Sequence, residues 1–307
     1  MEAILLNNLS KTYPGGKEAL RHMSLSLGTG EVFGFLGPNG AGKTTTVKLL
    51  NGILTPTEGF CQVLGTDPAK NPEKAHGLTG VVTEHAQMYN HLTGLDNLLF
   101  YASVFNIPAQ EGKKRALALL ERLGLAQAGN QKLASYSTGM RQRLSLARSL
   151  IHQPKVLFLD EPTSGLDPES AQNVNGLIRD LAREEGTTVF LCTHQLRYAQ
   201  ELCTRYGLIE EGRLLALGTL EELRAKVCQG ALLKIRASHM PNSCCSLYPS
   251  LHSANGWDYE MQIASEKEIP KILRQMIENG GELYSAETKF PSLEDIYFTL
   301  TAKEERT

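Results

Sequence analysis

Short apolar runs alternate with amphipathic stretches along the first part of the chain. Runs rich in branched and aromatic residues, bounded by turn-forming glycine and proline, predict strands over residues 3–9, 19–27, 31–36, 60–65 and 80–82. Apolar residues at helical spacing predict a helix over residues 44–52. This alternation of strands and helices is typical of an α/β fold.

The pattern changes near Leu92 and again after Pro154. Between these two points, helical spacing predicts a block of helices over residues 95–105, 111–123 and 138–152. Beyond Pro154, buried strands over 155–162 and 187–192 flank a helix over 168–184. We therefore expect a helical block inserted into a largely parallel sheet.

The last part of the chain has a third character. Strands are predicted over residues 231–237, 257–264 and 282–289, with helices over 268–279 and from Ser292 onward. This order suggests a small α+β domain. We predict a first domain over 1–225, with its core in 1–85 and 154–225 and its helical subdomain in 86–153, and an accessory domain over 226–307.

Composition and charge narrow the possible partners. The 307 residues can bury one domain of ordinary size and a smaller one, and 31 Lys and Arg against 33 Asp and Glu give no basic surplus for nucleic acid. The six cysteines lack C-x-x-C spacing, which favours reduced thiols in a cytosol. We see no signal peptide and no apolar run of bilayer-spanning length. We therefore expect this chain to serve a membrane only through a partner.

One segment between the strand over 31–36 and the following helix fits the phosphate-binding pattern G-x-x-x-x-G-K-[ST]. Its residues are Gly37, Pro38, Asn39, Gly40, Ala41, Gly42, Lys43 and Thr44. Glycines allow successive backbone N–H groups to face one anion, and the helix places its positive end there. Lys43 is expected at the β and γ phosphates, Thr44 at Mg²⁺ and Thr45 at the α phosphate. Kinases, GTPases, helicases and transport ATPases all share this loop.

Two further strands end in groups suited to hydrolysis. Asp160 and Glu161 follow an apolar run, so that Asp160 could hold Mg²⁺ and Glu161 could activate water; the alternative is an ordinary helix cap. His194 follows the next strand and could equally serve as a cap or a catalytic group. Because ligands bind beyond the carboxyl ends of parallel strands, these groups should converge with the P-loop. Tyr13 lies at a strand end, a position that by itself indicates an ordinary packing role.

Taken together in order, four segments resemble the motif set of ATP-binding cassette (ABC) ATPases: residues 37–44, 136–143, 160–167 and Thr193-His194. The resemblance covers about residues 1–225. It implies a P-loop NTPase (RecA-like) core with an inserted helical subdomain, and a head-to-tail dimer that sandwiches two nucleotides. It also implies that Ser137 and Gly139 cap the γ phosphate bound to the opposite subunit.

The resemblance assigns further roles. Asp167 would link the two sites, His194 would contact the γ phosphate, and Tyr13 would stack on adenine. Two positions depart from the family pattern: Thr138 replaces the first signature glycine, and the spacing places Glu84 where the family has a glutamine near Mg²⁺. Glu84 would add negative charge near the metal and the γ phosphate. Gln87 is the alternative position if the loop register shifts.

The resemblance implies the ATP-hydrolysing subunit of an ABC transporter. ATP and Mg²⁺ would be its cofactors, and separate transmembrane permease subunits would convert the ATPase cycle into transport, with export favoured by the C-terminal extension. The second ATPase would be another copy or a sibling, and the chain would lie at the cytoplasmic face of the membrane. Two alternatives are a soluble ABC protein acting on ribosomes or DNA and a P-loop small-molecule kinase.

Overall fold

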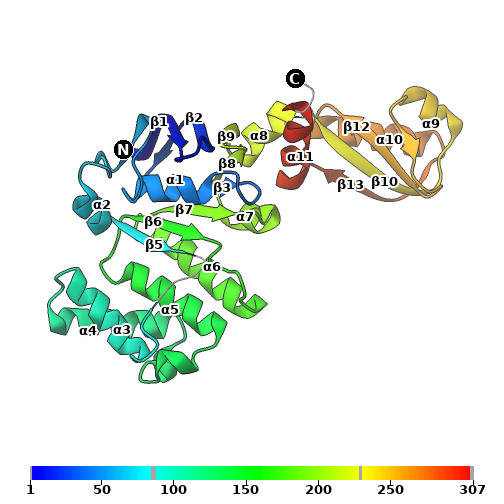
Figure 1. The fold of residues 1–307 in the computed structure, drawn as a ribbon. Coiled ribbons are helices and arrows are strands. Elements are labelled where there is room, and N and C mark those ends of the chain that lie inside the picture. Colours follow the sequence, from blue (N-terminus) through cyan, green and yellow to red (C-terminus); the bar gives the residue numbers. More distant parts are fainter. Residues whose placement is uncertain (1, 84–87, 228–229, 305–307) are drawn as a thin grey trace. The chain divides into compact units, whose positions relative to one another are not determined.

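The computed structural model describes residues 2–83, 88–227 and 230–304. It divides the chain into two compact units, Met1–Thr219 and Leu220–Thr307 (Figure 1). The sequence pattern placed this boundary after residue 225. Helix α8 (Leu220–Val227) instead joins the second unit, because the Arg224 guanidinium donates from Nε to the Pro291 carbonyl at 2.9 Å and lies 5.2 Å from the Phe290 ring centroid.

The centre of the first unit is a six-stranded sheet with the order β5-β6-β7-β3-β8-β9. Its strands are β3 (Val32–Leu36), β5 (Thr79–Val82), β6 (Val156–Asp160), β7 (Thr188–Thr193), β8 (Arg205–Glu210) and β9 (Arg213–Gly218). All neighbours pair in parallel except β8 and β9, a hairpin that the sequence pattern did not predict. Phe33, Phe158 and Phe190 are fully buried in it, which agrees with the continuous apolar runs of these strands.

A second, antiparallel sheet has the order β2-β1-β4. It consists of β1 (Glu2–Thr12), β2 (Glu18–Gly28) and β4 (Glu58–Val63). Helix α1 (Lys43–Leu50) packs between the two sheets, since its Val47 and Leu49 belong to one apolar cluster with Ile4 of β1 and Phe33 of β3 (Figure 1). The remaining helices of the core are α2 (Pro72–Leu78), α6 (Pro168–Arg183) and α7 (Leu196–Leu202).

The helical block follows β5, as the sequence predicts. It contains α3 (Gly94–Val104), α4 (Ala109–Arg122), the short 3₁₀ turns η1 (Ala126–Ala128) and η2 (Leu133–Ser135), and α5 (Thr138–Leu150). Its buried residues include Leu98, Leu120 and Leu144, one from each α-helix. The Thr93 hydroxyl caps α3 by accepting from the Asp96 N–H at 3.0 Å.

The second unit is built on a four-stranded antiparallel sheet with the order β11-β12-β10-β13. Its elements are β10 (Ala231–His239), α9 (Asn242–Leu247), β11 (His252–Ser253), β12 (Asp258–Ile263), η3 (Glu266–Glu268), α10 (Ile269–Glu278), β13 (Glu282–Lys289) and α11 (Leu293–Glu304). Leu233 and Ile235 on one face of β10 join Ile272 and Met276 of α10 in a separate core.

Two expectations from the sequence concern the state of the cysteines and the absence of membrane-spanning helices. Every cysteine in the described part is a free thiol: Cys61, Cys192, Cys203, Cys244 and Cys245. The helices of the described residues are all too short or too polar to cross a bilayer.

Candidate nucleotide site

The P-loop connects the end of β3 to the start of α1. Gly40 and Gly42 have φ angles of 87° and 112°, in the region that glycine adopts without steric cost. A Cβ atom on Gly42 would lie 2.6 Å from the Ala19 carbonyl oxygen, so this position has no room for a side chain. The glycine pattern therefore reflects a tight turn pressed against β2, and it leaves the N-terminus of α1 facing the loop.

Lys43 is buried and curls back over this loop. Its ammonium donates to the carbonyl oxygens of Gly37 at 2.6 Å and Pro38 at 3.0 Å. These two bonds keep a buried positive charge hydrogen-bonded. They also hold that charge beside the N–H groups of the loop, where a phosphate could replace the carbonyls as the acceptor.

Thr44 and Asp160 bring two oxygens together from α1 and β6. The Thr44 hydroxyl donates to Asp160 Oδ2 at 3.1 Å. Hydroxyl and carboxylate oxygens are ligands that suit Mg²⁺, which usually takes few protein ligands beside phosphate and water. Within the described residues, no group of three or more His, Cys, Asp and Glu side chains could hold a metal, so the fit to Mg²⁺ rests on this pair. Glu84, the third expected metal-site residue, and Gln87 lie outside the described residues.

Glu161 is held in an unusual backbone conformation between β6 and β7. Its φ is 48°, a left-handed value that is uncommon for a residue with a side chain. Oε1 accepts from the His194 backbone N–H at 2.9 Å and lies 2.6 Å from His194 Nδ1, and Oε2 accepts from the Thr193 hydroxyl at 2.8 Å. A carboxylate oxygen accepts, so Nδ1 is the donor in this contact, and Nε2 is the ring nitrogen directed away from Glu161.

These groups border one cleft of about 290 Å³. Its wall includes Tyr13, Thr45, the P-loop residues Asn39, Gly40, Gly42, Lys43 and Thr44, and the carboxylates Asp160 and Glu161. Tyr13 and Thr45 lie with their hydroxyl oxygens 3.2 Å apart. The cleft therefore gathers the aromatic side chain, the phosphate loop and the paired carboxylates.

Sequence reasoning missed three members of the site. Lys17 and Ala19 also border the cleft, and the Thr193 hydroxyl orients Glu161. Lys17 is a cation in the same turn as Tyr13, a signal that the sequence offered. The role of Thr193 depends on the pairing of β6 with β7, in which Asp160 lies opposite Cys192.

Ser137, Gly139 and Asp167 lie outside this cleft. Ser137 caps α5, accepting from the Met140 N–H at 3.2 Å, and Asp167 caps α6, accepting from the Ser170 N–H at 2.9 Å. Hydrogen bonds from Ser170 hold the pKa of the Asp167 carboxyl below its usual value. A Cβ atom on Gly139 would lie 3.3 Å from Leu166, so the loop after β6 packs against the start of α5.

Thr138, the departure from the family signature, also faces this loop. Its Cγ2 methyl lies 3.4 Å from the position that a Cβ atom on Gly165 would take. Thr138 is thus accommodated by contact with a glycine of its own chain.

The chain is similar to known proteins over most of its length. The family model described as "ABC transporter" matches residues 20–164. A daunorubicin resistance ATP-binding protein of Streptomyces coeruleorubidus is 35% identical over 309 residues, covering 99% of this chain and 97% of that protein. A fluoroquinolones export ATP-binding protein of Mycobacterium tuberculosis is 42% identical over 224 residues, covering 73% of each chain.

A solved structure extends this similarity. It is a dimeric ATP-binding cassette in a post-hydrolysis state with ADP and Pi bound, and it is 27% identical, with a TM-score of 0.65. The alignment covers 71% of this chain and 98% of that one.

Proposed function

Since this chain belongs to the ATP-binding subunits of ABC transporters, whose ATPase activity drives transport through separate permease subunits, we propose how its own residues divide that work. The observation that carries the proposal is the arrangement of one cleft. Lys43, the Thr44–Asp160 pair and the Glu161–His194 pair all border or contact it. A cation, a metal site and a base with its orienting partner are the parts that hydrolysis of a triphosphate needs.

The P-loop residues bind the triphosphate. Lys43 exchanges its two carbonyl acceptors for β- and γ-phosphate oxygens, which are stronger acceptors because they are charged. Thr45 donates to the α phosphate, and the ring of Tyr13 stacks on adenine. Thr44 and Asp160 would hold Mg²⁺, which neutralises charge on the phosphoryl oxygens when bound.

Glu161 is the base that accepts a proton from the attacking water. Its carboxylate has about four acceptor positions, and three hydrogen bonds from Thr193 and His194 fix its direction. His194 Nε2, directed away from Glu161, is the group that we assign to the γ phosphate, to which it donates when both ring nitrogens carry a proton. The pair thus couples recognition of the γ phosphate to activation of water.

The exposed start of α5 completes a site in a second ATPase subunit, either another copy or a sibling. Ser137 is exposed and lies outside its own chain's cleft. The backbone N–H groups there, with the Ser137 hydroxyl, form an anion-binding helix terminus. We assign Ser137 and Gly139 to the γ phosphate of the opposite subunit, and Asp167 to the link between the two sites.

An exposed apolar surface on the helical block receives the permease. Phe100 and Val104 lie one turn apart on α3 and are 40% and 57% exposed. The ring of Tyr89, 49% exposed, lies 4.9 Å from that of Phe100. Relatives named for daunorubicin resistance and fluoroquinolones export favour export as the direction, with this subunit at the cytoplasmic face.

The test is co-purification and turnover. We expect the chain to purify with a polytopic permease and to release phosphate from ATP faster in that complex. Robust phosphate transfer to a small acceptor, with no retained permease, would instead favour a P-loop kinase.

A further inference from the structure

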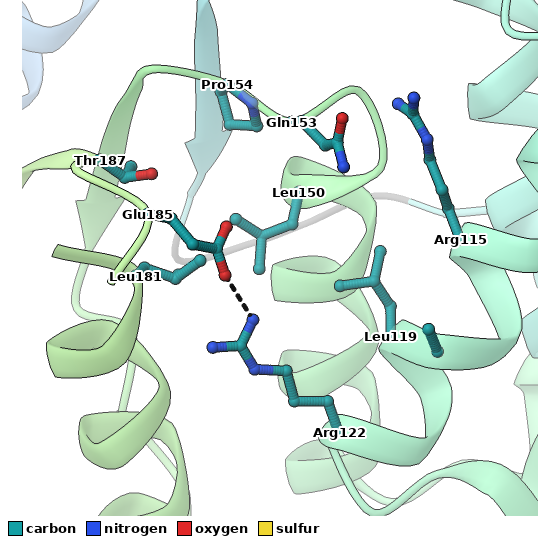
Figure 2. A pocket seen from close by; sticks show the side chains of 10 residues that line it. Arg115, Leu119, Arg122, Leu150, Gln153, Pro154, Leu181, Glu185 and Thr187 are labelled. Atoms are coloured by element: carbon teal, nitrogen blue, oxygen red, sulfur yellow. Dashed lines mark hydrogen bonds and ion pairs between the residues drawn. The ribbon is translucent and has the colours of Figure 1, made fainter. Parts of the chain in front are cut away.

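A second cavity of about 180 Å³ lies at the other edge of the core sheet (Figure 2). Pro154 and Thr187 border it and precede β6 and β7, whereas the nucleotide cleft lies where these strands end. Its walls come from α4 of the helical block on one side, and from the C-terminal ends of α5 and α6 on the others. Of the residues that the structure describes, none assigned to ATP binding or hydrolysis borders it.

The lining combines an apolar wall with cationic ends. Leu119, Leu150 and Leu181 supply the wall, and Arg115 and Arg122 project from α4 (Figure 2). The two arginines lie about two turns apart on the same helix. A concave apolar surface with few polar groups at its rim is the usual form of a small-molecule site. A guanidinium at that rim selects a carboxylate.

We propose that this cavity binds a small amphiphilic carboxylate, with its aliphatic chain along the three leucines and its carboxylate on Arg122. Arg115 is the weaker candidate for the anion, because Glu111 on its own helix already accepts from its Nε at 2.7 Å, and its Nη1 lies 3.4 Å from the Ile151 carbonyl.

Glu185 occupies the position that the ligand's carboxylate would take. Its Oε1 accepts from Arg122 Nη1 at 2.8 Å, and both residues line the cavity (Figure 2). The two side chains are 47% and 35% exposed, and an exposed ion pair of this kind is weak and readily exchanged. Glu185 therefore competes with the ligand's carboxylate for Arg122. Removing the charge of Glu185 should strengthen ligand binding, and removing the charge of Arg122 should weaken it.

The experiment titrates hexanoate into the purified full-length protein by calorimetry, with hexan-1-ol as the uncharged probe of the same length. We expect Glu185→Gln to tighten hexanoate binding about two- to five-fold, the most that an exposed ion pair is worth. Arg122→Gln should weaken it by at least about five-fold. Arg179→Gln, a matched change on α6 outside the cavity, should leave the affinity unchanged, and ATP should not displace the probe.

Several results would overturn the proposal. Equal affinity for hexan-1-ol would mean that no cation recognises the carboxylate. Displacement by ATP would locate the probe in the nucleotide cleft. If Arg122→Gln fails to fold, Glu185→Gln still decides the question, because unchanged or weaker hexanoate binding there contradicts the competition.

Discussion

Replacing Glu161 with glutamine isolates proton transfer from the structure of the site. The amide oxygen can take the place of Oε1, which accepts from the His194 N–H and contacts Nδ1. The amide nitrogen then faces the Thr193 hydroxyl, which can turn to accept its proton, because a hydroxyl has two acceptor positions and the Gln195 N–H uses one of them. The geometry survives the change, and only the ability to accept a proton is lost.

The magnitude follows from that loss. A positioned general base contributes about 10²- to 10⁴-fold to the rate, which raises the barrier by about 3–5 kcal/mol in Glu161→Gln. Charge-assisted hydrogen bonds become neutral ones, which lowers the free energy of unfolding by only about 1 kcal/mol. ATP affinity should be retained, so the variant should accumulate as an ATP-bound dimer.

The assay measures phosphate release at saturating ATP and Mg²⁺, nucleotide affinity by equilibrium dialysis, and mass by light scattering. Glu169→Gln makes the same change of charge at an exposed position of α6 and should hydrolyse ATP normally. Hydrolysis by Glu161→Gln at the wild-type rate would contradict the role of Glu161 as the base, which would then have to be another group.

Three further variants test other parts of the molecule. Gly42→Ala should abolish ATP binding and cost about 1–3 kcal/mol in denaturant unfolding, because φ is 112° and the new Cβ atom would lie 2.6 Å from the Ala19 carbonyl. Phe100→Asp should abolish permease co-purification without changing the basal ATPase rate, because it places a charge in the proposed apolar interface. Burial holds the pKa of His152 below its usual 6.5, so its contribution to stability is present above pH 6.5 and is lost as pH falls through the folded-state pKa; His152→Gln should flatten the thermal-melt profile in this range.

Each of these variants has a matched control. Gly77→Ala meets open space and should retain ATP binding, and Leu117→Asp, at an exposed residue of α4, should retain the permease. His91→Gln, at an exposed position, should leave the pH profile unchanged. The prediction for Gly42 would be wrong if Gly42→Ala bound ATP fully. The prediction for Phe100 would be wrong if Phe100→Asp retained the permease, and the prediction for His152 would be wrong if His152→Gln left the pH profile unaltered.

The local structure of this protein is predictable from its sequence. Continuous apolar runs predicted the buried strands, and helical spacing predicted the inserted block. The P-loop could be recognised in the sequence because its turn requires a φ of 112° at Gly42, which restricts the residue type at that position. Such requirements lie within a few neighbouring residues, so one chain suffices to express them.

Which side chains meet depends on how distant segments of the chain pack together. Glu161 and His194 are far apart in sequence, and their 2.6 Å contact depends on β6 lying beside β7 in register. The assignment of α8 to the second unit likewise depends on a distant partner, because Arg224 donates to the Pro291 carbonyl. The cavity beside Arg122 lies where α4 meets the turn after α6, which carries Glu185. Packing between distant segments determines these contacts. The periodicity of apolar residues does not specify the register between strands or the contacts between helices.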